Sequence, residues 1–408
     1  MSMAAVLLAF IGMLLVAVML EPLAQRLRLP SSLLLAAAGF AGASLIVAAG
    51  IDTGLRWQHF HDLAFYVILP LLIFESALRI DARRLLRELP ALLILAIPLL
   101  LLTLFVSAAL IYAGIDHPSG FPWTTALVCG ALLATTEPFT LTGLARRLRV
   151  PQRLLVLMEG ESLLSDTTGI VLFTLLIAIA GGALPQADAA ALGSRFLVLF
   201  AGGILTGLVA GTAAAWLLRN GQRPAIVTLL AAWGAYLVAE LWLQVSGVMA
   251  VLAVGLLCGA SLRRLAPSQA GLLTWWWEQL GWVSTSTLFL LAGATFTLAM
   301  FEQRWLAMLI GVAAVLLARV AGIALFSLLP GRLPGIAPLP AGYATLMAWG
   351  GQRGAVTLAL ALSLPTSLEA WWTVQSIAYG VVLFSLLVQA PTLGPLLAWL
   401  RGHGKGYM

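Results

Sequence analysis

The chain has 408 residues, of which 62% are hydrophobic and only 9% are charged, and its mean hydropathy is +1.03. Soluble proteins carry roughly 25% charged residues, so this composition excludes an ordinary soluble protein and indicates many membrane spans. The net charge of +6 would suggest nucleic-acid binding in a soluble protein, but Lys and Arg lie in short loops here, which argues against a nucleic-acid partner.

Apolar windows separated by polar breaks predict thirteen transmembrane helices, at about 20 residues per span. In chain order they are expected at residues 3–20, 31–50, 63–78, 91–114, 122–144, 154–182, 195–218, 224–242, 246–260, 281–300, 305–329, 341–364 and 370–400. We expect the first to be a retained helix and not a cleaved signal peptide, and no long cytoplasmic tail after the last. Residues 1–408 are therefore expected to form a single integral membrane unit.

The distribution of Lys and Arg tests this division, because cytoplasmic loops carry an excess of positive charge. The loops after odd-numbered spans, together with the C-terminal end, hold 17 of the 22 cations, and the opposite loops hold 3. The N-terminus is therefore expected outside, and the C-terminus in the cytoplasm, of a bacterial-type cytoplasmic (inner) membrane. The two remaining cations, Arg319 and Arg353, fall inside predicted spans.

The cysteines and histidines argue against several kinds of site. Cys129 and Cys258 lie in apolar runs, and the four histidines lie in loops or at the end of the chain. A disulfide framework and a His-based metal site are therefore disfavoured, and no cofactor is expected. An intramembrane enzyme is also disfavoured, because the sequence has no H-E-x-x-H, G-x-S-x-G or P-loop motif and no histidine within a span.

Five acidic residues are expected at membrane depth, where an ionised side chain costs at least about 2.5 kcal/mol and marks an ion or proton path. They are Glu75, Glu137, Glu159, Glu161 and Asp166. Only two arginines are expected at that depth, so the acids cannot all be paired. Some acid is therefore expected to hold a proton or a bound cation.

The sixth predicted span concentrates the polar side chains. At about 1.5 Å per residue, Asp166 lies near mid-membrane, and Ser162 and Glu159 share its face of the helix, while Glu161 and Ser165 form a neighbouring pair. Carboxylate and hydroxyl oxygens suit a hard monovalent cation, and a carboxylate also accepts a proton. The alternative, that these groups only bond helices together, is less favoured for two acids in one span.

Two other spans carry signals of interruption. The fifth contains Thr135–Pro138, where the proline removes a backbone donor; an ordinary proline kink is the alternative. The twelfth contains Gly350–Gly354 with Arg353 inside it, which close packing of small residues does not explain. Because the two spans are seven apart, they cross the membrane in opposite directions, as an inverted-repeat transporter requires.

Two charged residues elsewhere complete the set. Glu75, late in the third span, is either an acid of the site or a residue that extends to the cytoplasmic edge. Arg319 lies mid-span, where an unpaired guanidinium is very costly and cannot lose its charge. It needs an acidic partner, and Glu161 is the first candidate.

At this point the chain resembles the NhaP/NHE branch of monovalent cation:proton antiporters. The signature of that family reads roughly A-T-D-P, then E-G-E-S-L-L-N-D, then G-G-x-R-G-A-V. The matching stretches are Ala134–Pro138 in part, Glu159–Asp166 and Gly350–Val356. The resemblance covers nearly the whole chain in span number and motif order.

The resemblance implies an ion site. Asp166 is expected to alternate between a cation and a proton, with Ser162 and the backbone or hydroxyl of Thr136 as ligands and Glu75 as a contributing acid. The expected neighbours of this Na⁺ site are Glu137, Ser165 and Glu159.

The resemblance also assigns the buried charges and exposes two departures. Glu161 is expected to pair with Arg319 as a structural bridge, and Arg353 to neutralise the broken twelfth helix. Ser165 stands where the family usually has Asn, and Glu137 where it usually has Asp. Ser165 is neutral, so a single exchanging carboxylate remains, but ion preference and site geometry are open.

The family further implies an all-α inverted-repeat fold and a homodimer. The ion-translocating core is expected at approximately 91–182 and 305–400, with two interrupted crossing helices, spans 5 and 12. The remaining helices, approximately 1–90 and 195–300, are expected to form the dimerisation and linker part.

The predicted function is secondary active transport, in which Na⁺ (or in its place Li⁺ or K⁺) is exchanged for H⁺ by alternating access, with a role in pH homeostasis. One carboxylate that binds either one cation or one proton suggests electroneutral 1:1 exchange. The alternatives are a cation channel, a proton-conducting pathway, and an antiporter that prefers K⁺. The inverted pair of interrupted spans favours an exchanger.

Overall fold

The computed structural model describes residues 3–27, 29–50, 57–115, 120–137, 150–182, 189–220, 223–262, 264–328, 339 and 341–402. Within these ranges the chain is helical almost throughout. Nine of the described helices are long and apolar enough to cross a membrane, and Trp123–Ala134 and Gly247–Leu262 are shorter apolar helices. The predicted class, an all-α polytopic membrane protein, is confirmed, while thirteen crossings and the inverted repeat remain predictions.

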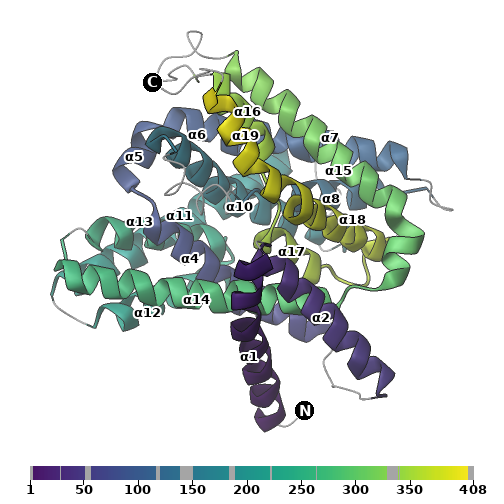
Figure 1. Cartoon of the computed structure of the whole chain (residues 1–408). Helices are drawn as coiled ribbons and strands as arrows, with labels where there is room; N and C mark the ends of the chain where they lie inside the picture. Colours follow the sequence, from purple (N-terminus) through teal and green to yellow (C-terminus); the bar gives the residue numbers. More distant parts are fainter. Residues whose placement is uncertain are drawn as a thin grey trace.

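Figure 1 shows the arrangement of the helices, with α10 in the middle of the molecule. The first half of the chain contains α1 (Met3–Leu27), α2 (Ser31–Ala48), α3 (Trp57–Asp62), the π-helical segment η1 (Leu63–Ile68), α4 (Leu69–Arg79), α5 (Ala82–Arg87), α6 (Leu89–Ala96), α7 (Pro98–Gly114), α8 (Trp123–Ala134) and α10 (Gln152–Ala180). The second half contains α11 (Ala189–Arg219), α12 (Pro224–Leu237), the π-helical segment η2 (Val238–Leu243), α13 (Gly247–Leu262), α14 (Pro267–Ala294), α15 (Leu298–Ser327), α16 (Ala341–Gly350), α17 (Ala355–Leu362), α18 (Trp371–Phe384), the π-helical segment η3 (Ser385–Gln389) and α19 (Ala390–Gly402).

Proline and one aspartate set several helix starts. Pro70, Pro98, Pro224 and Pro267 occupy the first turn of their helices, where a missing N–H costs nothing. Asp81 precedes α5, and its Oδ1 accepts hydrogen bonds from two backbone N–H groups of the first turn at 2.9 and 3.2 Å. The cap at Asp81 accounts for the break between α4 and α5, and Pro90 lies in the first turn of α6.

The helices pack in two groups that meet at α10. In one, α13 packs against α4 and α11, and α14 packs against α2; in the other, α7 packs against α8 and α15, and α15 against α18. Helix α10 contacts α8 and α6 of the second group and also α13 and α4 of the first. The polar helix singled out by its sequence is therefore at the centre of the contacts.

One predicted span is misplaced. The tenth was expected at 281–300, but α14 runs from Pro267 to Ala294 and a separate helix begins at Leu298. Three consecutive tryptophans and nearby polar residues lower the hydropathy of the first half of α14. That half is nevertheless packed, because Trp277 is 1% exposed and its Nε1 donates to Thr228 Oγ1 at 3.0 Å.

Candidate ion-binding site

Two interrupted helices meet beside α10. Helix α8 ends at Ala134 and the chain continues extended through Glu137; helix α16 ends at Gly350 and α17 begins only at Ala355. Across this crossing the Glu137 backbone N–H donates to the carbonyl oxygen of Gln352 at 2.8 Å, as an isolated antiparallel bridge. Pro138, the residue predicted to cause the first interruption, lies outside the described residues.

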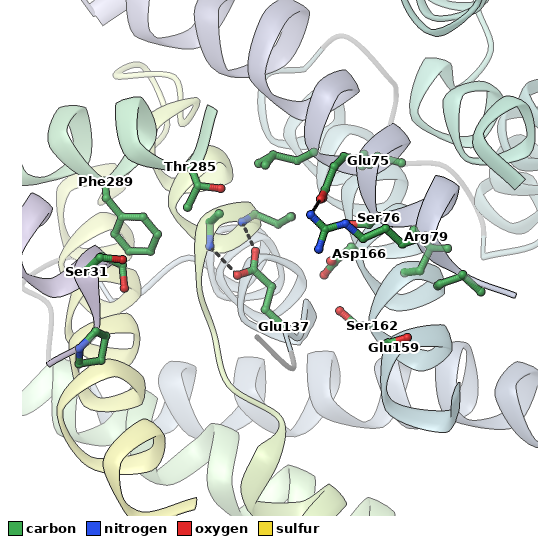
Figure 2. A pocket seen from close by; sticks show the side chains of 18 residues that line it. Ser31, Glu75, Ser76, Arg79, Glu137, Glu159, Ser162, Asp166, Thr285 and Phe289 are labelled. Atoms are coloured by element: carbon green, nitrogen blue, oxygen red, sulfur yellow. Dashed lines mark hydrogen bonds and ion pairs between the residues drawn. The ribbon is translucent and has the colours of Figure 1, made fainter. Parts of the chain in front are cut away.

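The side chain of Glu137 caps the N-terminus of α17. Its two carboxylate oxygens accept hydrogen bonds from the backbone N–H groups of Ala355 and Val356 at 2.9 and 2.8 Å, and Figure 2 shows the carboxylate turned toward these donors. A carboxylate is favoured there because the first N–H groups of a helix have no partner within it. A Cβ on Gly354 would lie 2.1 Å from Glu137 Oε2, so a larger residue at this position would displace the carboxylate from the start of α17.

Asp166 lies halfway along α10, facing the interruption of α8. Its Oδ1 accepts a hydrogen bond from the backbone N–H of Thr136 at 3.2 Å, and the residue is 8% exposed. A carboxylate held by a neutral amide keeps its negative charge uncompensated at this contact. It is therefore available to a mobile cation or a proton.

Hydroxyl groups surround this carboxylate. Ser162, one helical turn before Asp166, donates through its Oγ to the carbonyl oxygen of Thr136. The hydroxyls of Thr136 and Ser165 lie 3.1 Å apart, and Ser165 Oγ also donates to the carbonyl oxygen of Ser162 at 3.0 Å. These oxygens form a network beside the interruption of α8, in which Ser162 lines the same cavity as Asp166. Oxygen donors of this kind are what a hard cation prefers.

A cavity of about 450 Å³ opens beside Asp166 and Ser162. Asp166, Ser162, Glu137 and Glu159 line it, together with the residues at the end of α4. Figure 2 shows these side chains around the hollow. Among the described residues, no three His, Cys, Asp or Glu side chains form a cluster suited to a metal ion.

Glu161 faces away from this cavity and contacts Arg319 of α15. Arg319 donates to both carboxylate oxygens, to Oε2 at 2.9 Å, and its Nε donates to the carbonyl oxygen of Met347 at 3.1 Å. The two side chains are 3% and 4% exposed. All the charge of this acid is therefore opposed by a guanidinium, in contrast to Asp166.

Arg353 is buried at the second interruption. Its Nε donates to the carbonyl oxygen of Leu133 at 2.8 Å and its Nη1 to that of Gly351, while its backbone N–H donates to Ser385 Oγ at 3.1 Å. Ser385 Oγ in turn donates to Gln389 Oε1 at 2.6 Å. The guanidinium thus bonds carbonyls left without helical partners in both interrupted spans.

Glu75 lines the cavity from the end of α4, where it is paired with Arg79, one turn later on the same helix. Its side chain is 13% exposed, so it belongs to the wall of the cavity rather than to an open surface. The sequence had left open whether it belongs to the site or to the membrane edge.

Sequence reasoning missed the contribution of α14. Thr285 and Phe289 line the same cavity, and Glu278 lies near Arg79. The available signal was a spacing of three or four residues, which places positions 278, 281, 285 and 289 on one face of a helix. Residue 278 lay outside the predicted span, which began at residue 281, so the four positions were not recognised as one face of a helix.

The fold and the crossing define the class of this protein: a polytopic helical membrane protein with an oxygen-lined acidic site between two interrupted helices, the arrangement of a secondary transporter. The family model described as "Sodium/hydrogen exchanger, transmembrane" matches residues 9–399. The chain belongs to this family, a family of transporters and not of enzymes, and the predicted resemblance is confirmed.

Curated relatives agree with this assignment. The Na(+)/H(+) antiporter ApNhaP of Aphanothece halophytica is 34% identical over 81% of this chain and 63% of its own length. The Na(+)/H(+) antiporter NhaP of Pseudomonas aeruginosa is 31% identical over 84% of this chain and 82% of its own length. The low-affinity Na(+)/H(+) antiporter NhaS1 of Synechocystis is 30% identical, and the chain again spans only 63% of its length.

A solved structure shares the fold. The sodium proton antiporter MjNhaP1 from Methanocaldococcus jannaschii superposes with a TM-score of 0.81, covering 97% of this chain and 99% of its own. The sequence identity is 21%, so the likeness concerns the fold.

Proposed function

We propose that the protein exchanges Na⁺ for H⁺ across a cytoplasmic membrane by alternating access, with Asp166 as the carboxylate that binds either ion. One observation carries the proposal. Asp166 is buried in the middle of α10, is held by a backbone amide and not by a guanidinium, and lines a cavity with Ser162. An acid in this environment is the default mark of an ion or proton path in a membrane protein.

Cation transport is coupled to proton transport because the two ions exclude each other at the Asp166 carboxylate. A protonated carboxyl has lost the negative charge that attracts a cation, and a bound cation occupies the oxygens that a proton needs. We assign Ser162 and Thr136 as further ligands, Glu75 as a contributing acid, and Glu137, Ser165 and Glu159 as neighbours. One exchanging carboxylate per site corresponds to electroneutral 1:1 exchange.

The choice of Na⁺ rests on the relatives, whose names describe Na⁺/H⁺ antiporters. Oxygen ligands alone do not separate Na⁺ from Li⁺ or K⁺. A cation series in proteoliposomes with an imposed pH gradient tests both ion and class. Exchange by Na⁺ that reverses with either gradient supports the proposal, whereas cation flux independent of the proton gradient would indicate a channel and overturn it.

Three wider assignments belong to the same proposal. We assign residues 91–182 and 305–400 to the moving core and residues 1–90 and 195–300 to dimerisation and linkage, in a homodimer with the N-terminus outside. The two packing groups that meet at α10 support this division. Helix α11 has an exposed apolar face that includes Leu197, Leu205 and Val209. Crosslinking across this face should give dimers if the division is correct, and only monomers otherwise.

A further inference from the structure

A second charged cluster lies beside the ion site, between α4 and α14. Glu75 and Arg79 come from the last two turns of α4, and Glu278 comes from the middle of α14. The Nη2 of Arg79 contacts Glu75 Oε1 and lies 3.8 Å from Glu278 Oε1. A single guanidinium nitrogen is thus placed between two carboxylates from two different helices.

The two carboxylates differ in their access to solvent. The side chain of Glu75 is 13% exposed, whereas those of Arg79 and Glu278 are 49% and 42% exposed. Glu75 is the inner partner of the guanidinium and Glu278 the outer one. A movement of Arg79 toward Glu278 would therefore leave the buried carboxylate without a counter-ion.

Two cavities meet at this cluster. Glu75 and Arg79 line the 450 Å³ cavity that contains Asp166. They also line a second cavity of 690 Å³, together with Glu21 and Glu278. Arg79 consequently stands where the second cavity joins the ion site.

The helices around the cluster are held firmly, while the guanidinium is at the end of a flexible side chain. The rings of Phe74 and Trp277, the residues that precede the two acids, have centroids 4.2 Å apart. A Cβ on Gly281 would lie 3.1 Å from Glu75 Cδ, so α14 packs directly against this carboxylate. The Glu75 carboxylate is therefore held in place by packing, whereas the side chains of Arg79 and Glu278 are 49% and 42% exposed and have room to move.

We infer that Arg79 is a tethered counter-ion that competes with the transported cation for Glu75, and that Glu278 receives the guanidinium when the cation arrives. The inference rests on the proposed cation exchange. Arginine does not lose its charge, so it vacates Glu75 only by moving. Partly exposed ion pairs contribute little to stability, which makes this one displaceable by a cation. Arg79 and Glu278 are thus positioning residues that tune cation affinity.

The test is the apparent KM for Na⁺ in proteoliposomes, measured separately from kcat. Arg79→Gln removes the competitor, so KM should fall by about two- to fivefold. Glu278→Gln removes the outer acceptor and should raise KM by a similar factor, with kcat little changed. In the Arg79→Gln background, Glu278→Gln should have no effect, because its partner is absent.

Glu21→Gln is the matched control, because Glu21 lines the second cavity but not the cavity that contains Asp166. If the acids acted only by attracting cations, Glu278→Gln and Glu21→Gln would raise KM equally, in both backgrounds, and that result would overturn the inference. A rise in KM for Arg79→Gln would overturn it too. If Arg79→Gln does not fold, Arg79→Lys replaces it: because Lys also carries a positive charge, its KM should stay near the wild-type value, and a fall would overturn the inference. Absence of exchange in the wild-type protein would instead overturn the proposed function.

Discussion

Asp166 and Glu161 lie five positions apart on α10, and both are buried carboxylates. Glu161 receives two hydrogen bonds from Arg319, whereas Asp166 receives one from a backbone amide and opens on a cavity beside hydroxyl groups. The same chemical group is opposed by a guanidinium in one place and meets a neutral amide in the other. The comparison teaches that the neighbouring donor, and not burial, separates an acid whose charge is neutralised from one that is open to a cation or a proton.

The strongest challenge to this comparison is Asp166→Asn. The amide has nearly the same shape but neither binds a proton at working pH nor carries a charge, so cation-driven proton movement in everted vesicles should fall to background. The protein should still fold, as checked by its Tm in detergent, because no charge is left unpaired. Exchange at a near-normal rate would contradict the role of Asp166.

The next largest effect is expected at Glu161, and it should appear in stability. Glu161→Gln leaves Arg319 buried without an opposing charge, which costs about 3–5 kcal/mol of the free energy of unfolding. Thermal unfolding in detergent should show a clearly lower Tm. The double variant Glu161→Leu with Arg319→Met should recover part of the lost stability, because no unpaired charge remains. If it recovers none, the ion pair stabilises the fold by more than the mutual neutralisation of its two charges.

The pH dependence sharpens the distinction further. Competition between a proton and a cation at Asp166 predicts that the apparent KM for Na⁺ rises as pH falls, by up to about tenfold per pH unit where the carboxyl is mostly protonated. Any folded Glu161 variant should show the same dependence of KM on pH. A KM that is independent of pH would mean that the two ions do not share a group.

The smallest effect is expected at Ser162. Ser162→Ala removes one hydroxyl but leaves the carboxylate, so KM for Na⁺ should rise about three- to tenfold with a smaller change in kcat, as for loss of one hydrogen-bonding or ligand group. Ser376→Ala is a suitable control, because that buried hydroxyl bonds only within its own helix, to Trp372 at 2.7 Å. Equal effects of the two substitutions would argue against Ser162 as a ligand.

Much of the site was predictable from residues that are unusual for a membrane helix. A charged side chain among apolar residues is conspicuous in any window of sequence, so all five acids and both arginines were found. Two features of the site were not predicted from the sequence. The capping of α17 by Glu137 joins residues more than two hundred positions apart. The position of Thr285 on the cavity wall was the other, because the sequence does not show which face of α14 packs toward α10 and α4.

The amino-acid sequence alone determined the membrane class, the approximate position of most helices, and the identity of the buried charges, because the transfer of a side chain from water to lipid is a property of each residue. Only the tertiary structure decided that Asp166 met a backbone amide, that Glu137 capped α17, and which acids opened on a cavity. Those outcomes depend on how helices distant in sequence pack, and local composition carries no record of that packing.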